Sequence, residues 1–327
     1  MRAPEFWAHE SPYATLLSPA ASVYEFCTQA LNGLIRPVHA SIPIICVGNL
    51  TVGGTGKTPV ALAIAEHLKA LDKKVHFLTR GYRGRLSGPV AVDPITHSAV
   101  DVGDEALLLA RAAPTWIARD RTKGAEAAAA AGAEIVVMDD GFQNPSLIKD
   151  LSILVVDGGY GFGNGRILPS GPLRENLARG LSRAHAVVFL EDPIADNVIQ
   201  RPPQATPPWF GARFVPGHEA LRLAGQRVVA FAGIGRPQKF FATLKALGSY
   251  VVTAQAFPDH HTYDPDEIMR LVEIASETGS HLVTTEKDRV RLPPEARDMV
   301  EVVRVFVEFA ESNALARMLD PVSTAIT

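Results

Sequence analysis

The stretch that decides the fold of this chain reads Gly48-Asn49-Leu50-Thr51-Val52-Gly53-Gly54-Thr55-Gly56-Lys57-Thr58. It follows an apolar run at residues 42–47 and precedes residues 61–68, whose apolar side chains recur with helical periodicity. A strand, a Gly-rich turn and a helix that begins in Gly-Lys-Thr form a cradle for phosphate. Glycines let backbone N–H groups turn toward phosphate oxygens, and the helix N-terminus adds a partial positive charge. The pattern predicts a nucleoside triphosphate site.

Two side chains of this loop have specific expected roles. Lys57 is expected to reach the β- and γ-phosphates, and the Thr58 hydroxyl is expected to bind Mg²⁺. The loop departs from the usual pattern in one place, because Thr51 stands where a glycine is usual, six positions before the lysine. The alternative is an ordinary Gly-rich turn, which the strand before and the helix after argue against. The predicted nucleotide-binding residues are Thr51, Val52, Gly53, Gly54, Thr55, Gly56, Lys57 and Thr58.

The composition is that of a globular protein with a sizeable core. The chain has 327 residues, 47% of them hydrophobic and 20% charged, which is enough for two domains of ordinary size. A formal net charge of −3 gives no electrostatic signature of a nucleic-acid partner. The two cysteines, Cys27 and Cys46, have no metal or redox spacing, and Cys46 lies inside an apolar run typical of a core strand. We therefore expect a cytoplasmic protein.

Strand-like and helix-like segments alternate after the phosphate loop. The alternation predicts an α/β fold of the P-loop NTPase type, with helices on both faces of a mostly parallel sheet. The proline-rich run at residues 201–208 is the strongest linker signal, and a second, smaller α/β set follows it, in which residues 300–306 are expected to form the last strand. The predicted divisions are an N-terminal helical segment at 1–40, a nucleotide-binding domain at 41–200, a linker at 201–226 and a C-terminal α/β domain at 227–327.

The N-terminal segment predicts an amphipathic helix from Ser18 to Arg36. Apolar residues recur every three or four positions, while Glu25, Gln29 and Asn32 fall between them. These polar residues argue against a transmembrane span, which needs about 20 mostly apolar residues. Two interpretations remain open from periodicity alone: a helix packed on the core, or a helix lying in a membrane interface.

Polar residues directly after predicted strands are candidates for a ligand site, because ligands of parallel sheets bind at the carboxyl ends of strands. Asp139 and Asp140 end one apolar strand and fit a Mg²⁺-organising role, with a plain acidic turn as the alternative. Arg80 and Arg83 follow another strand and suit an anion, since guanidinium groups pair with phosphate oxygens; the alternative is a pair of solvated surface arginines.

Three further segments contain candidate residues. The Gly-rich segment at 158–175 includes Arg166 and Arg174, which are candidate phosphate contacts. Asp104 begins a predicted helix, where helix capping is the alternative to a site role. In the second domain, adjacent histidines rarely bind one ion together, so His260 is better interpreted as a single histidine that supports proton transfer.

In order and chemistry these segments resemble the tetraacyldisaccharide 4′-kinases, the lipid A pathway enzymes that phosphorylate the 4′-hydroxyl of the disaccharide 1-phosphate. The resemblance runs through most of the chain, and Thr51 in the phosphate loop is typical of that family. One departure is Ala106, where the family usually has proline after the two acids. The segments that carry the resemblance are residues 47–59, 79–84, 103–105, 139–143, 168–175, 257–260 and 284–288.

The resemblance implies a kinase that uses ATP and Mg²⁺ on a lipid, tetraacyldisaccharide 1-phosphate. It also implies peripheral, monotopic association with the cytoplasmic face of the bacterial inner membrane, which favours the interface interpretation of residues 18–36. No nucleic acid and no obligate protein partner are implied.

By the family motifs, Asp104 would accept the 4′-hydroxyl proton with support from His260, and Lys57 would act on the phosphates. Asp139 and Asp140 would organise the metal with Thr58, and Arg174 and Glu175 would line the active site, with Arg80 and Arg83 as further substrate contacts.

Two other functions are compatible with a P-loop chain of this kind. A P-loop GTPase switch or metallochaperone would read guanine with an Asn-Lys-x-Asp element, whereas the nearest candidate here, residues 285–288, has its Lys and Asp adjacent. The sequence also has no Cys or His cluster to carry a metal. A P-loop kinase acting on a small soluble substrate is the third possibility, and the amphipathic N-terminal helix argues against it.

Overall fold

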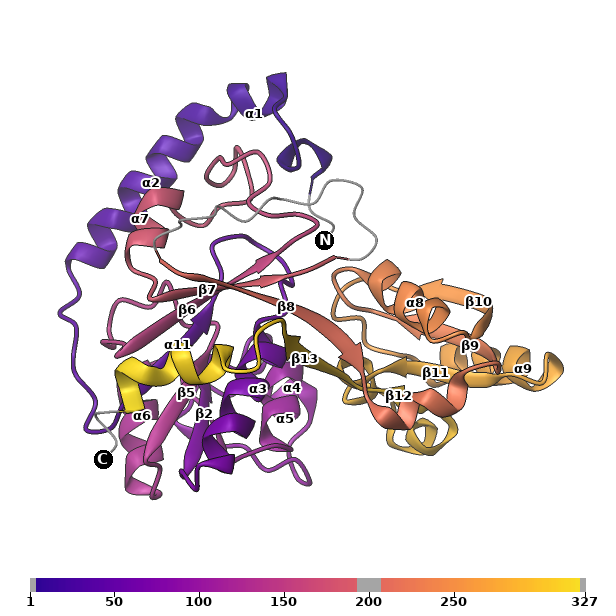
Figure 1. Ribbon diagram of the computed structural model, residues 1–327. Helices are drawn as coiled ribbons and strands as arrows, with labels where there is room; N and C mark the ends of the chain where they lie inside the picture. Colours follow the sequence, from indigo (N-terminus) through magenta and orange to yellow (C-terminus); the bar gives the residue numbers. More distant parts are fainter. Residues whose placement is uncertain (1–3, 193–206, 324–327) are drawn as a thin grey trace. The chain divides into compact units, whose positions relative to one another are not determined.

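The computed structural model describes residues 4–192 and 207–323, which form two compact units (Figure 1). The first unit contains the described residues up to Arg213 and those from Val307 onward. The second unit is Phe214–Phe306. The chain therefore passes between the units twice.

The first unit is built on a single large sheet. Nine strands of the described residues pair in the order β13-β8-β7-β6-β1-β5-β2-β4-β3. The central pairs are parallel, and β3 is antiparallel to β4, so the predicted α/β fold with a mostly parallel sheet is confirmed. The strands are β1 (Ile44–Gly48), β2 (Val75–Thr79), β3 (Val90–Ala91), β4 (Thr115–Ile117), β5 (Ile135–Asp139), β6 (Leu151–Asp157), β7 (Ala186–Leu190), β8 (Trp209–Pro216) and β13 (Val305–Phe309).

Helices cover both faces of this sheet. Ile44 and Cys46 of β1 share one apolar cluster with Ala125 and Ala128 of α6, while the alternate strand residues point to the opposite face, where α3 packs on β1 and β5. Burial raises the pKa of the Cys46 thiol to about 12, as befits a core residue. The helices are α1 (Pro12–Leu16), α2 (Ser18–Gly33), α3 (Lys57–Ala70), α4 (Ala99–Val102), α5 (Asp104–Ala110), α6 (Arg121–Ala130), α7 (Leu177–Ser182) and α11 (Ala314–Ser323), with a 3₁₀ turn η1 at Glu5–Trp7.

The second unit is a smaller parallel sheet with helices on both faces. Its strands pair in the order β10-β9-β11-β12. Val228 and Ala230 of β9 lie in one cluster with α8, and the alternate residues Val229 and Phe231 lie in a second cluster with α9. The elements are η2 (His218–Leu223), β9 (Arg227–Ala232), α8 (Pro237–Ala246), β10 (Tyr250–Ala256), α9 (Pro265–Glu277), β11 (His281–Thr285), α10 (Glu286–Arg289), η3 (Pro294–Met299) and β12 (Glu301–Val303).

The structure differs from the predicted domain limits at both passages of the chain. Residues 201–206 of the predicted linker lie outside the described residues, and the rest of it contains β8, whose Trp209 and Phe210 are buried beside β7. The expected single strand at 300–306 is two strands, interrupted at Arg304: β12 pairs in the second sheet and β13 joins the first. Residues 307–323 consequently pack with the first unit rather than with the C-terminal domain.

Helix α2 presents its apolar side chains to the outside. Within α2 only Ala21 is buried, and the half-buried positions include the polar residues Glu25, Thr28 and Asn32. The interpretation of this helix as one packed on the core by its apolar face is therefore wrong. Large exposed apolar residues in and around α2 are Tyr13, Leu16, Val23, Tyr24, Phe26, Leu31, Leu34, Ile35 and Val38.

Candidate active site

The phosphate loop joins the end of β1 to the start of α3. Gly53 (φ +118°) and Gly56 (φ +89°) have backbone conformations that favour glycine, whereas Thr51 does not have a positive φ. Thr51 instead forms an antiparallel bridge with Leu173 and is buried. A glycine is therefore not needed at position 51, which accounts for the departure from the usual pattern.

Segment 172–174 holds the first half of the loop in place. The Val52 N–H donates to the Pro172 carbonyl at 2.9 Å, and the Arg174 N–H donates to the Leu50 carbonyl at 2.8 Å. The Asn49 side chain, fully buried, donates to the Thr51 carbonyl at 2.7 Å. The second half leads into the first turn of α3, whose N–H groups have no partner within the helix and so are suited to an anion.

The two acids after β5 have different partners. Asp139 accepts a hydrogen bond from the Thr58 hydroxyl at 2.8 Å. Asp140 has left the strand, with φ +53°, and lies 3.6 Å from Lys57 Nζ and 3.2 Å from the Arg174 guanidinium. The acids and the loop meet because β5 pairs with β1 in register, with Val47 opposite Asp139.

The electrostatic environments of these acids also differ. Burial, and then the nearby charge of Glu105, raise the pKa of Asp139 to about 7, against the opposing effect of Lys57. Burial also acts to raise the pKa of Asp140, but the charges of Lys57 and Arg174 outweigh it and hold that pKa below its ordinary value. The Oδ1 atom of Asp139 is buried and has no hydrogen-bond partner among the described residues.

Arg174 and Glu175 lie beside the acids in a network that includes a residue the sequence had not singled out, Gln143. Its side-chain amide donates to the Asn49 carbonyl at 2.9 Å and to Glu175 at 3.1 Å, and its oxygen lies 3.4 Å from Arg174. Glu175 also pairs with Arg183 at 2.5 Å. Gln143 is the last residue of the segment 139–143, only three positions after Asp140. This closeness to the two acids in the sequence is the signal that could have indicated a site role for it.

Three arginines lie on or near strand ends at this edge, with different surroundings. Arg80, directly after β2, and Arg83 are both exposed. Arg83 also lies over the Tyr82 ring, 5.7 Å from its centroid. Arg121, which sequence reasoning missed, is buried at the start of α6 and donates to the Ala118 carbonyl at 2.5 Å. Burial and the charge of Arg80 lower its pKa to about 10, while Asp140 acts to raise it. Arg121 therefore belongs to the same charged cluster.

Arg166 does not serve as a free anion contact. Its guanidinium donates to Glu10 at 2.7 and 3.2 Å and to the Ser18 hydroxyl at 2.8 Å. The segment around it makes further bonds to the N-terminal turns, from Trp7 to the Pro169 carbonyl and from Ser170 to the Ala14 carbonyl. Arg166 thus anchors α1 and α2 to the segment that supports the phosphate loop.

Asp104 is the first residue of α5 and is buried. The N-cap position belongs to Gly103, and the Asp104 carboxylate accepts from the neighbouring Glu105 N–H at 3.0 Å. Asp104 is thus not the N-cap residue itself, although its carboxylate accepts an N–H of the first helical turn.

In the second unit, the two adjacent histidines have separate surroundings. His261 stacks on Phe257, with ring centroids 4.8 Å apart, and its Nε2 lies 2.8 Å from Glu267. His260 has φ +60°, and its Nε2 lies 3.6 Å from Asp259. His261 is thus committed to packing. Within the described ranges no three His, Cys, Asp or Glu side chains converge to hold a metal ion.

Comparisons with known proteins identify the family. The model of the tetraacyldisaccharide-1-P 4′-kinase family matches residues 13–323. Relatives named tetraacyldisaccharide 4′-kinase in Rhodospirillum rubrum and Rhodospirillum centenum are 52% and 50% identical, over 98% of this chain and 97% and 96% of theirs. A crystal structure of LpxK from Aquifex aeolicus in complex with ATP matches with a TM-score of 0.77 at 27% identity, covering 96% of this chain and 99% of that one. The chain belongs to the tetraacyldisaccharide 4′-kinase family.

Proposed function

We propose that this protein is an ATP-dependent kinase that transfers the γ-phosphate to the 4′-hydroxyl of tetraacyldisaccharide 1-phosphate, forming the bis-phosphorylated lipid A precursor. The observation that carries the proposal is the junction of Lys57 and Thr58 with Asp139 and Asp140, in a chain that matches the family over residues 13–323. The family match also decides against the GTPase switch or metallochaperone. The related structure was solved with ATP, which supports ATP as the phosphate donor.

The nucleotide phosphates would lie against residues 51–58. Backbone N–H groups and the start of α3 would hold the phosphate oxygens, and Lys57 would neutralise charge on the transferring group. Asp140, which also pairs with Arg174, would keep Lys57 in place, since its carboxylate contacts both cations.

The residues present suit a Mg²⁺ ion. Thr58 and Asp139 would hold it, because their side chains already meet at 2.8 Å and the second oxygen of Asp139 has no hydrogen-bond partner among the described residues. The ion, when bound, would neutralise phosphate charge during transfer. Asp139 is the better candidate for the metal, because Asp140 is paired with cations.

Asp104 would accept the proton of the attacking hydroxyl, and His260 would support it. Asp104 stands at the amino end of α5, and His260 is the histidine of its pair that is not stacked into the core. Arg80, Arg83, Arg174 and Glu175 remain the proposed substrate contacts, and Arg121 joins them as a buried cation of the same cluster.

The lipid substrate implies work at a membrane surface. Among the described residues no helix is both long and apolar enough to cross a bilayer. Phe26, Leu31 and Leu34 expose 73%, 64% and 81% of their surface, and this face of α2 would lie in the interface on the cytoplasmic side of the inner membrane. Arg166 would hold the helix there relative to the phosphate loop.

The proposal is tested by incubating the purified protein with ATP, Mg²⁺ and tetraacyldisaccharide 1-phosphate in mixed micelles. Formation of a lipid heavier by one phosphate, located at the 4′ position by mass spectrometry, is the expected result. ATP hydrolysis without a phosphorylated lipid, or equal activity on the free soluble disaccharide, would contradict it.

A further inference from the structure

A fully buried carboxylate in the second unit lies at the centre of a network on the loop that carries His260. Asp288 of α10 is 0% exposed. Its Oδ1 accepts from the Gly233 N–H at 2.9 Å, from the Tyr263 hydroxyl at 2.7 Å and from Arg291 at 2.7 Å, and its Oδ2 accepts from the Thr285 hydroxyl at 2.5 Å. A buried charge with this many donors is strongly committed to one geometry.

Three of the four donors come from neighbouring strand ends. Gly233 follows β9, Tyr263 belongs to the loop after β10, and Thr285 ends β11. These strands are adjacent and parallel in the order β10-β9-β11, so their carboxyl ends lie at one edge of the sheet. Asp288 therefore joins three separate segments of the chain at that edge.

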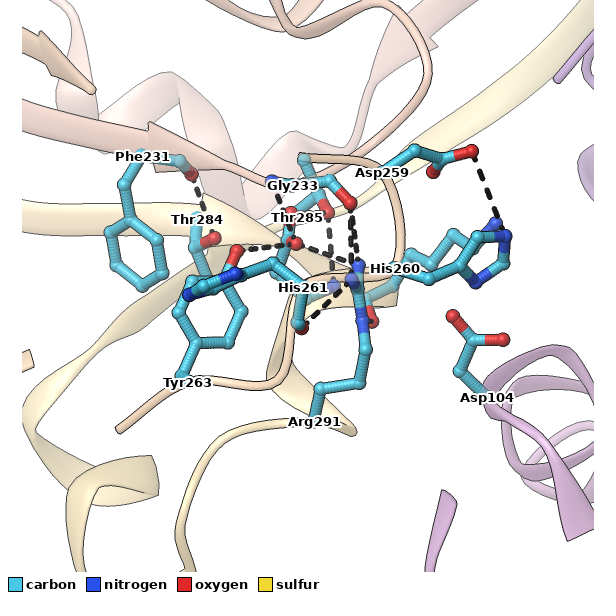
Figure 2. A network of polar contacts seen from close by, with 12 residues as sticks. Asp104, Phe231, Gly233, Asp259, His260, His261, Tyr263, Thr284, Thr285 and Arg291 are labelled. Carbon is cyan, nitrogen blue, oxygen red and sulfur yellow. Dashed lines mark hydrogen bonds and ion pairs between the residues drawn. The ribbon is translucent and has the colours of Figure 1, made fainter. Parts of the chain in front are cut away.

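Arg291 extends the network to the backbone of the histidine loop, as Figure 2 shows. Its guanidinium donates to the Gly233 carbonyl at 3.0 Å and to the His261 carbonyl at 3.1 Å. The same Gly233 carbonyl accepts from the His260 N–H at 3.1 Å. His260 is thus bonded directly to a residue that Asp288 and Arg291 both hold.

The conformation of His260 needs such support. A φ of +60° is uncommon for a residue other than glycine and is kept where the surroundings determine it. Close packing contributes, since a Cβ on Gly233 would lie 2.9 Å from the Tyr263 hydroxyl and 3.0 Å from the Pro258 carbonyl. Tyr263 is in turn fixed by the rings of Phe231 and Phe257 at 5.3 and 5.2 Å.

We propose that Asp288 is a positioning residue for His260, acting through Gly233, Tyr263 and Arg291 on the backbone of the loop at 257–263. The inference rests on the proposed function, because it gives a purpose to the fixed orientation of His260 in phosphoryl transfer. Misplacement of a supporting group by about 1 Å lowers turnover by up to about a hundredfold.

The test uses Asp288→Asn and Tyr263→Phe in the full chain. Asp288→Asn keeps the shape but removes the charge, and Tyr263→Phe removes one donor while keeping the ring. Ser249→Ala is the matched control, because it deletes another buried hydroxyl of the same unit, bonded to the Leu223 carbonyl at 2.9 Å. We measure kcat and KM for ATP, thermal unfolding, and the His260 backbone amide signal in ¹⁵N-histidine-labelled protein, assigned by comparison with His260→Gln.

Both network variants should lower kcat by about ten- to a hundredfold with KM for ATP within about twofold, and both should shift the His260 signal. Ser249→Ala should lower the unfolding temperature without either change. An unmoved His260 signal overturns the proposal, and so does turnover no lower than in Ser249→Ala when His260→Gln itself loses activity. If Asp288→Asn does not fold, Tyr263→Phe alone decides. A shifted signal with full activity in both Tyr263→Phe and His260→Gln would support the positioning and contradict the catalytic role of His260.

Discussion

Lys57 is the cation proposed to act on the transferring phosphoryl group. It is 9% exposed and is held near Asp140. We expect Lys57→Ala to lower kcat by about 10²–10³-fold, because a positioned cation stabilises charge that develops in the transition state. Lys69→Ala on the same helix is the control, since Lys69 is exposed and donates to the Ala112 carbonyl. A folded Lys57→Ala protein within about threefold of wild-type turnover would contradict the role of the loop.

Asp139 should make both stability and metal binding depend on pH. Its folded pKa, about 7, is raised above the ordinary value of 3.8, so this group favours folding at low pH and that contribution is lost as the pH rises through about 7. Mg²⁺ needs the ionised carboxylate, so Mg²⁺-dependent ATP binding should strengthen over the same range.

The measurement is calorimetric titration of ATP with Mg²⁺ at pH values from about 6 to about 8, together with thermal unfolding without ligand. Asp139→Asn should weaken binding and flatten both profiles. A wild-type binding profile that is flat across this range would show that Asp139 does not titrate on binding the metal.

At the scale of single elements, α2 is a surface helix whose exposed face is apolar, whereas the exposed face of a surface helix is usually polar. Its anchoring depends on polar contacts such as the hydrogen bond from Arg166 to the Ser18 hydroxyl, so its apolar side chains contribute little to folding. Replacing Phe26, Leu31 and Leu34 by serine should lower binding to anionic phospholipid vesicles at least tenfold, since burying each side chain is worth about 1.5–3 kcal/mol. The unfolding temperature should change little.

The control for α2 replaces Leu71, Ile95 and Val100 by serine, which are exposed by 56%, 92% and 66% elsewhere in the same unit. This variant should bind vesicles like the wild type. Equal loss in both variants would mean that general surface hydrophobicity, rather than α2, drives binding.

At the scale of the whole molecule, the proposed proton-transfer pair is divided between the two units. Asp104 belongs to the first and His260 to the second. General base assistance contributes about 10²–10⁴-fold, so Asp104→Ala and His260→Ala should each lower kcat strongly with little effect on ATP affinity. Residues that act as one unit are not additive, and the double variant should be little worse than the worse single variant. Multiplicative losses in steady-state kinetics would indicate two independent roles.

The sequence by itself determined the features that depend on contiguous residues. The phosphate loop at 48–58 and the alternation of strands and helices were readable because glycine conformation, helix capping and apolar periodicity are local properties. The family resemblance, now confirmed, rests on such short segments. The roles predicted for individual site residues stay predictions.

Only the tertiary structure decided how distant segments meet. Thr58 binds Asp139 across 81 positions and Arg166 binds Glu10 across 156, and neither pairing has a local signal. Strand order separates β12 from β13 around Arg304, and the packing of α2 leaves Glu25 and Asn32 half-buried while its apolar residues are exposed. These outcomes depend on which surfaces the packed sheet leaves available. Packing and pairing are properties of the whole fold, whereas periodicity describes one element at a time.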